Sequence, residues 1–339
     1  MPEGASLVLG GARFQITYKG GALGRDVVLK RASSIPVLAA SGLPMVASSA
    51  VGNSVVVRQS NGRTSITDAF DSSFHGGVRS AAGFNSATGQ QILVAGTGAG
   101  IPAQVKVFNL ATGSVIAILN PFPGFQGGVF VATGDVNKDG VSDFVVSADA
   151  GTAPMIRVYD GKTLVLLKGF LAYTSSFRGG VRVACADVNG DGFADVVTGN
   201  GAGALCEMRV FDAKLGFKLT SMATVGPVGF RGGIFVAAGD LTGDGKAELI
   251  AGLDQGSVPQ VTVIRGGSQL GVSRTFLAMD ASFRGGVRVG VASAGGAFPS
   301  IITGNGAGVP AQINVFDGRT FARLDTFFSL LDGDEGVFV

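Results

Sequence analysis

The stretch that decides the fold is Phe177-Arg-Gly-Gly-Val-Arg-Val-Ala-Cys-Ala-Asp187-Val-Asn-Gly-Asp191-Gly-Phe-Ala-Asp195-Val-Val-Thr198. It opens on Phe-x-Gly-Gly, continues as an alternating apolar run, passes through an acidic loop and enters a second apolar run. Apolar runs of this length between Gly-rich or acidic turns are typical of β-strands. The same phrase starts again at Phe74, Phe125, Phe230 and Phe283, at intervals of 51 to 53 residues. An internal repeat therefore organises the chain.

Each full repeat contains four strand-like runs, which is the pattern of one β-propeller blade. Ahead of the five full repeats, three runs match the later part of a repeat: Ile35-Pro-Val-Leu-Ala-Ala40, Ser54–Arg58 and Thr64–Phe70. The last residues, 334–339, match only a first strand. We therefore predict an all-β fold for residues 32–339, a six-bladed β-propeller of four-stranded antiparallel blades. Pairing of the C-terminal strand with the N-terminal strands would close the ring and leave no open end.

Two kinds of repeat alternate along the chain. The second residue of the first strand is, in turn, Arg79, Phe130, Arg182, Phe235, Arg288 and Phe338. Gly-x-Gly-Ala-Gly turns occur only in the Arg repeats, at 96–100, 199–203 and 304–308. Strict alternation round a closed ring needs an even number of blades, which favours six over seven. We expect a cation–π contact between each Arg and an aromatic ring of the next blade; inheritance from a duplicated pair of blades explains the pattern equally well.

Composition narrows the classes of function. The 339 residues include 56 Gly, 24 Phe and no Trp, with 15% charged residues and a formal net charge of +2. This balance lacks the basic footprint of nucleic-acid-binding proteins, so no nucleic-acid partner is expected. Gly, Asp or Arg interrupts every apolar run before it reaches membrane-spanning length, so no transmembrane segment is expected. The two cysteines, Cys185 and Cys206, do not make a disulfide framework.

Three successive repeats carry an acidic loop after their first strand, at 135–143, 187–195 and 240–248. Each loop has oxygen-bearing side chains at positions 1, 3, 5 and 9 and Gly at position 6, which suits a hard cation such as Ca²⁺. The carbonyl oxygen of position 7 can add a further ligand. The expected ligands are Asp135, Asn137, Asp139, Val141 and Asp143; Asp187, Asn189, Asp191, Phe193 and Asp195; and Asp240, Thr242, Asp244, Lys246 and Glu248.

These loops predict about three calcium sites between strands. An EF-hand would have Glu at position 12, where the loops have Val146, Thr198 and Ala251. Asp, Asn and Gly also favour turns for their own sake, but three copies in register, each ending in a carboxylate, favour a metal. Thr242 is a weaker ligand, so the third site should bind least tightly. The repeats that start at Phe74 and Phe283 lack the carboxylates and should hold no ion.

No catalytic constellation emerges from the residues. His75 is the sole histidine, and the other repeats have Gln126, Arg178, Arg231 and Arg284 in its place. It is therefore a loop variant rather than a general base or zinc ligand. The Arg residues at this position either bond neighbouring backbone carbonyls or form a partly basic ring that attracts acidic glycans. We expect no catalytic residues and no enzyme activity.

The chain resembles FG-GAP, or VCBS-type, repeat proteins over residues 32–339. The matching features are the Phe-x-Gly-Gly openings, the Asp-x-Asn-x-Asp-Gly-x-x-Asp loops and the Val-Phe-Asp turns, as at 209–212 and 314–317. This family includes the head of integrin α subunits, and the resemblance implies a calcium-bearing propeller. The chain departs from the family by losing the calcium motif in the outer repeats. It also has six blades where the integrin head has seven.

Residues 1–31 do not follow the repeat. The segment 14–29 alternates, turns at Gly20-Gly21 and alternates again, which predicts a β hairpin. Its Tyr18-x-Gly-Gly-x-x-Gly-x-Asp-Val-x-Leu29 phrase resembles the end of an autotransporter-associated β-strand repeat. That resemblance implies a remnant of an upstream repeat region in a larger surface protein, which would explain why no signal peptide is visible.

Taken together, the residues and the resemblance predict a non-enzymatic, calcium-binding propeller. It would act as an extracellular or cell-surface binding or adhesion module, secreted or surface-bound, as a monomeric propeller within a larger protein. Its partner would be a protein or glycan that the sequence does not name, because propeller loops change partners without changing the fold. Two alternatives stay open: a lectin-like carbohydrate-binding propeller, and a propeller polysaccharide hydrolase or lyase.

Overall fold

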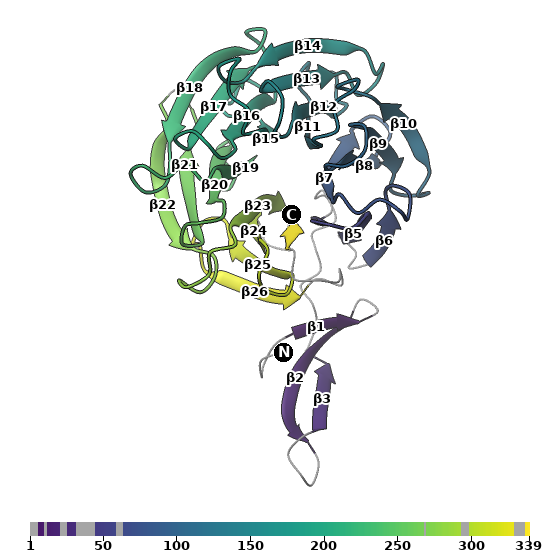
Figure 1. Ribbon diagram of the computed structural model, residues 1–339, viewed down its shortest axis with the longest axis vertical. Helices are drawn as coiled ribbons and strands as arrows, with labels where there is room; N and C mark the ends of the chain where they lie inside the picture. Colours follow the sequence, from purple (N-terminus) through teal and green to yellow (C-terminus); the bar gives the residue numbers. More distant parts are fainter. Residues whose placement is uncertain are drawn as a thin grey trace.

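Six four-stranded antiparallel sheets surround a central axis as the blades of a propeller (Figure 1). The computed structural model describes residues 6–9, 12–20, 26–31, 45–58, 64–267, 269–292, 298–328 and 336–339. Every regular element in these ranges is a β-strand, and no helix among them is long and apolar enough to cross a membrane. The predicted fold class is confirmed.

Five blades are built from consecutive strands, with the first strand of each nearest the axis and the fourth at the rim (Figure 1). Blade 2 contains β7 (Val78–Asn85), β8 (Gln90–Thr97), β9 (Val105–Asn109) and β10 (Val115–Leu119). Blade 3 contains β11 (Val129–Gly134), β12 (Asp143–Ala148), β13 (Met155–Tyr159) and β14 (Leu166–Leu171). Blade 4 contains β15 (Val181–Ala186), β16 (Asp195–Asn200), β17 (Glu207–Asp212) and β18 (Lys218–Thr224). Blade 5 contains β19 (Ile234–Gly239), β20 (Glu248–Leu253), β21 (Gln260–Arg265) and β22 (Gly271–Leu277), and blade 6 contains β23 (Val287–Ala292), β24 (Ser300–Asn305), β25 (Gln312–Asp317) and β26 (Arg323–Phe328).

Blade 1 is assembled from both ends of the propeller. Its strands β4 (Met45–Ser49), β5 (Ser54–Arg58) and β6 (Thr64–Asp68) are completed by β27 (Val337–Phe338). Val337 lies opposite Ser49 and Phe338 opposite Ser48, in an antiparallel pair. The C-terminal strand therefore closes the ring, as predicted from the partial repeat at the end of the chain.

One predicted strand of blade 1 was wrong. The second-strand place belongs to β4 at 45–49, whereas the sequence interpretation put that strand at 35–40, which lies outside the described residues. Both runs are short and apolar, so periodicity did not separate them. The length of the connecting loop separates them, because only residues 50–53 lie between β4 and β5, which is a normal length for a hairpin loop.

Burial follows the position of each strand in its blade. The second strands β12, β16, β20 and β24 are buried at every residue, because sheets of neighbouring blades cover both of their faces. The fourth strands at the rim are largely exposed, as β14 shows. The core therefore lies between blades, and each inner strand is held by contacts with the blade beside it.

A separate antiparallel sheet precedes the propeller. It contains β1 (Ser6–Leu9), β2 (Ala12–Gly20) and β3 (Asp26–Arg31), in the order β1-β2-β3. β2 and β3 cover the stretch expected to form a hairpin, and β1 is a further strand that the sequence did not suggest. β1 lies beside β26 of blade 6 (Figure 1). The boundary at residue 31 and the origin of this segment stay predictions.

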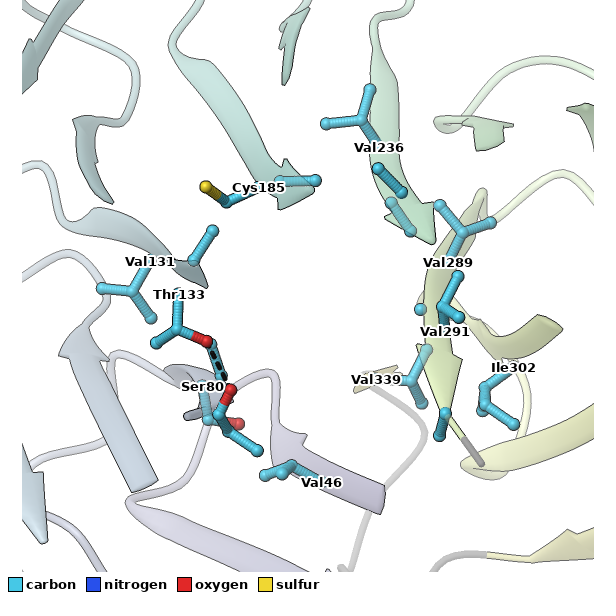
Figure 2. Close-up of a pocket in the computed structure, with 18 of the residues that line it drawn as sticks. Val46, Ser80, Val131, Thr133, Cys185, Val236, Val289, Val291, Ile302 and Val339 are labelled. Carbon is cyan, nitrogen blue, oxygen red and sulfur yellow. Dashed lines mark hydrogen bonds between the residues drawn. The ribbon is translucent and has the colours of Figure 1, made fainter. Parts of the chain in front are cut away.

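The inner strands enclose an axial cavity of about 200 Å³ (Figure 2). Val and Ala side chains from all six blades form most of its wall. Ser80 and Thr133 supply hydroxyls, and the hydroxyl of Thr133 donates to the carbonyl oxygen of Ala82. Cys185 is the sole ionisable side chain among the described residues that line it, and burial raises the pKa of its thiol well above the usual range. The cavity therefore offers shape and apolar surface rather than acid–base groups.

Candidate cation loops and the axial ring

The three acidic loops lie at one end of the propeller, each between the first and second strands of its blade. In blade 3 the carboxylate of Asp135 accepts hydrogen bonds from the backbone N–H of Asp139 at 3.0 Å and of Gly140 at 2.8 Å. The side-chain oxygen of Asn137 accepts from the same Asp139 N–H at 3.0 Å. Asp139 in turn accepts from the N–H of Val141 at 2.9 Å. The oxygens of positions 1 and 3 thus meet at one backbone N–H, and the loop curls around them.

The loops of blades 4 and 5 repeat this arrangement. Asp187 accepts from the N–H of Asp191 at 3.1 Å and of Gly192 at 2.7 Å. In blade 5, position 1 accepts from positions 5 and 6 in the same way, at 3.2 and 2.8 Å. Gly at position 6 has positive φ in all three loops, at Gly140, Gly192 and Gly245, which a side chain would make costly. Three separate loops therefore share one conformation.

The carboxylate of position 9 makes hydrogen bonds that the sequence did not predict. Both carboxylate oxygens of Asp143 accept backbone hydrogen bonds, from Val136 at 2.8 Å and from Gly161 at 2.9 Å. Asp195 does the same with Val188 and Ala213, both at 3.2 Å. These bonds tie the acidic loop to the turn between the third and fourth strands. The ninth carboxylate therefore acts at least as a structural brace, and its role as a metal ligand stays a prediction.

Burial raises the pKa values of the position-9 carboxylates. Asp143 and Asp195 have almost no exposed surface, and desolvation raises the pKa of Asp143 to about 6 and that of Asp195 to about 7. The acidic neighbours Asp160 and Asp135 raise the pKa of Asp143 further, whereas the two backbone N–H groups lower it. Burial likewise raises the pKa of Glu248. Excess negative charge at these loops favours a cation nearby.

The donor set of each loop fits a hard cation in part. In blades 3 and 4 the side-chain oxygens of positions 1 and 3 meet at the backbone N–H of position 5, whereas in blade 5 the hydrogen bond from that N–H goes to position 1. Across the described residues, however, no three His, Cys, Asp or Glu side chains gather into one cluster. A cation here would depend on neutral oxygens as well, from Asn137, Asn189 or Thr242 and from backbone carbonyls, as Ca²⁺ sites commonly do.

Neighbouring loops contact one another across blade boundaries. Lys138 of the first loop donates to the carbonyl oxygen of Asp191 in the second at 3.3 Å, and its ammonium lies 5.3 Å from the Phe193 ring centre. Lys246 of the third loop lies against Gly190 of the second. On the far side, Arg319 donates to the carbonyl oxygen of Thr242 at 3.3 Å. The three loops thus form one continuous arc.

Blade 2 replaces the acidic loop by a tight hairpin turn between β7 and β8. Asn85 caps this turn by accepting from the N–H of Ala87 and Thr88. Ser86 bonds to the carbonyl oxygen of Gly140 at 2.8 Å, so the turn also packs on the first acidic loop. In blade 6 the corresponding residues 293–297 lie outside the described ranges. The sequence expectation that these two blades hold no ion stays a prediction.

The opposite end of the axis holds a ring of alternating arginines and phenylalanines. Each guanidinium lies over two phenyl rings at 5.0 to 5.3 Å: Arg79 over Phe130 and Phe338, Arg182 over Phe130 and Phe235, Arg288 over Phe235 and Phe338. The three Phe rings also pack edge to face, with centroids 5.9 to 6.1 Å apart. The predicted cation–π contacts are confirmed, with two per arginine.

Two carboxylates that sequence reasoning missed complete part of this ring. Asp149, just after β12, pairs with Arg79 at 3.2 Å, and Asp254, just after β20, pairs with Arg182 at 3.1 Å. Each acid sits in the blade that follows its arginine, so about 70 residues separate the partners. The signal in the sequence was the same Asp at the same place in two Phe repeats.

The ring also explains why Gly-x-Gly-Ala-Gly turns accompany arginine. A Cβ on Gly98, Gly201 or Gly306 would lie 1.9 to 2.0 Å from Nη1 of the arginine and 1.6 to 1.8 Å from a backbone carbonyl oxygen. That same carbonyl, of Gly76, Gly179 or Gly285, accepts a hydrogen bond from Nη1 at 3.2 to 3.3 Å. Only glycine leaves room for the guanidinium.

The remaining candidates have structural roles. Arg178 and Arg284 are exposed, and each donates to two backbone carbonyl oxygens of its own loop. Arg178 donates to those of Ser175 and Phe177, and Arg284 to those of Ala281 and Phe283. This favours the backbone-bonding interpretation over a glycan-binding ring. His75 is exposed on a loop. Cys185 and Cys206 are both free thiols.

Comparison with known proteins places the repeats in a family. A model of the FG-GAP-like repeat matches residues 187–251, which include the second and third acidic loops. Residues 187–251 therefore contain FG-GAP-like repeat sequence. A stretch of 74 residues is 36% identical to integrin alpha-V of Gallus gallus, and it makes up 21% of this chain and 7% of that relative. The matched stretch thus covers less than a tenth of the length of this relative.

Solved structures agree with the fold alone. The chain is similar to Sqt1 of Saccharomyces cerevisiae, with a TM-score of 0.50 and 11% identity, over 96% of this chain and 85% of that one. It is also similar to the Dos1 propeller, with a TM-score of 0.44 and 12% identity, over 83% of this chain and 66% of that one.

Proposed function

We propose that this FG-GAP propeller is a non-enzymatic, calcium-stabilised binding module of a secreted or surface protein. The observation that carries the proposal is the arc of three acidic loops with one shared conformation. Positions 1, 3 and 5 of each loop would hold the ion, and the carbonyl of position 7 would add an oxygen. Bound Ca²⁺ supplies positive charge that offsets the buried carboxylates. It fixes the loops on one face of blades 3 to 5.

The binding part of the proposal rests on the fold and on the partial integrin likeness. Propellers present loops from several blades on one face, and a rigid face loses less entropy when a partner docks. The described residues of the axial cavity supply no acid–base pair, which favours binding over catalysis. A protein or a glycan would be the partner, and a lectin-like role is the alternative that the same face permits.

Thermal unfolding tests the calcium claim. Ca²⁺ bound to the folded chain should raise the melting temperature with the logarithm of its concentration, and EDTA should reverse the rise. Asp135→Ala, Asp187→Ala and Asp240→Ala each remove a position-1 ligand, and the triple variant should lose the response. Thr88→Ala, in the hairpin turn of blade 2, is the matched control and should keep it. Equal melting curves in millimolar Ca²⁺ and in EDTA would overturn the claim.

Partner screens address the second claim. A glycan array and a panel of extracellular matrix proteins, each run in Ca²⁺ and in EDTA, separate a lectin from a protein adhesin. Calcium-dependent capture of either class supports a binding module. Release of reducing ends from a polysaccharide would instead establish an enzyme.

A further inference from the structure

Among the described residues, the axial ring has three arginines but two acids. Blades pair as 2 with 3, 4 with 5 and 6 with 1, so the arginine of the third pair is Arg288. Asp149 and Asp254 follow their second strands directly, and the residue in the same place of blade 1 is Ala50. The three positions are equivalent in register, since the residues before them, Ala148, Leu253 and Ser49, pair with the first residue of a first strand.

The third arginine keeps every other contact of its counterparts. Arg288 lies over two phenyl rings and donates Nη1 to the carbonyl oxygen of Gly285 at 3.3 Å. Arg79 and Arg182 direct Nη2 at a carboxylate oxygen, and among the described residues Arg288 has no carboxylate within salt-bridge distance. Burial lowers the pKa of Arg288 to about 10; Asp254, which is already paired with Arg182, raises it, and the two other arginines lower it. It remains charged at neutral pH, so the described ring carries one uncompensated positive charge.

The two formed Arg–Asp pairs show that solvent reaches this position of the ring. In the two formed pairs the arginines keep 13% and 12% of their side-chain surface exposed, and the acids keep 15% and 14%. The turn that carries Ala50 also differs from its counterparts. Gly151 and Gly256 have positive φ, at 105° and 95°, whereas Gly52 has no positive φ and donates its N–H to the Ser49 hydroxyl at 2.7 Å. A methyl side chain in place of a carboxylate leaves the guanidinium facing this turn.

We propose that Arg288 binds an external carboxylate in the place that Asp149 and Asp254 fill in the other two blade pairs. The ligand would be a small carboxylate or the acidic side chain of a protein partner, approaching the axis from the Arg–Phe end. A charge-assisted bond to a partly buried guanidinium is among the stronger polar contacts in proteins. The site lies at the opposite end of the axis from the acidic loops, so it goes beyond the proposed function and does not depend on calcium.

Saturation-transfer NMR of acetate, in EDTA, provides the direct test, with acetamide as the neutral control. Acetate should show saturable transfer and acetamide none. Ala50→Asp supplies the missing acid and should weaken acetate binding by about tenfold or more. Asp149→Ala opens a second position at Arg79 and should increase the transfer amplitude. A capped Gly-Asp-Gly peptide against Gly-Asn-Gly distinguishes the sources, because only a site open to protein side chains binds the peptide.

Three outcomes would overturn the proposal. Absence of transfer to acetate in the wild-type chain would do so, as would equal transfer in wild type and Ala50→Asp, provided that Ala50→Asp melts as a folded protein. Asp334 and Glu335 lie outside the described residues, and they directly precede Gly336 in the sequence. Transfer that appears only after Glu335→Gln or Asp334→Asn would show that the chain supplies its own carboxylate.

Discussion

Arg182 and Gly201 are fitted to each other: a Cβ on Gly201 would lie 1.9 Å from Nη1 of Arg182. The two residues sit on the first strand of blade 4 and on the turn after its second strand. The same relation holds in the other two Arg blades. The pairing of arginine with a Gly-rich turn is therefore a steric requirement, which common descent from a duplicated pair of blades does not by itself supply.

Gly201→Ala should destabilise the propeller by about 2 kcal/mol or more, because the methyl group displaces either the guanidinium or the Gly179 carbonyl. Urea-induced unfolding measures the change. Gly271→Ala is the matched control, because a Cβ at this glycine on β22 meets nothing within 4 Å. The control should be neutral or slightly stabilising. Equal effects at the two glycines would contradict the steric argument.

Phe235→Leu should cost roughly 2 kcal/mol, because the ring holds two guanidinium groups, those of Arg182 and Arg288, each 5.1 Å from its centre. Leucine keeps most of the apolar contact and removes the cation–π attraction. Phe84→Leu, at a residue with 38% of its surface exposed, is the control and should change stability by less than about 0.5 kcal/mol. If Phe235→Leu lowers the free energy of unfolding no more than Phe84→Leu does, the cation–π contacts of the axial ring do not stabilise the fold.

Thr242→Asn should tighten calcium binding by the third loop, about tenfold, because an amide oxygen is a better Ca²⁺ ligand than a hydroxyl at position 3. Calorimetric titration in an Asp135→Ala, Asp187→Ala background isolates this loop. Thr242→Val, which has no oxygen at the position, should weaken binding. If Asn and Val variants bind alike, position 3 is not a ligand.

Stability in EDTA should fall as the pH rises from about 5 to 8. Burial raises the folded-state pKa of Asp195 to about 7, above the unfolded value near 4. The folded chain therefore binds the extra proton, so this contribution is present at low pH and is lost as the pH passes through 7. Asp143 adds the same trend up to about pH 6. Melting temperatures across this range should fall less steeply in Asp195→Asn, and an unchanged slope would contradict the assignment.

Local patterns in the sequence were enough for the architecture. The period, the four runs per repeat and the single first strand at 334–339 predicted six blades and their closure, because each blade is a local unit that repeats its own turns. The Arg–Phe alternation predicted the axial contacts for the same reason, since equivalent positions on successive inner strands must face one axis. The conformation of the acidic loops also follows from residues within nine positions of each other.

Tertiary structure decided what depends on contacts between distant residues. The acids Asp149 and Asp254 reach arginines of the preceding blade, which chain proximity does not indicate. The ninth loop carboxylates are engaged by turns 18 residues away, at Gly161 and Ala213. The true second strand of blade 1, at 45–49, was fixed by its neighbours rather than by its composition. A repeat therefore specifies its blade locally, whereas the ion pairs at the blade boundaries form only when neighbouring blades pack together.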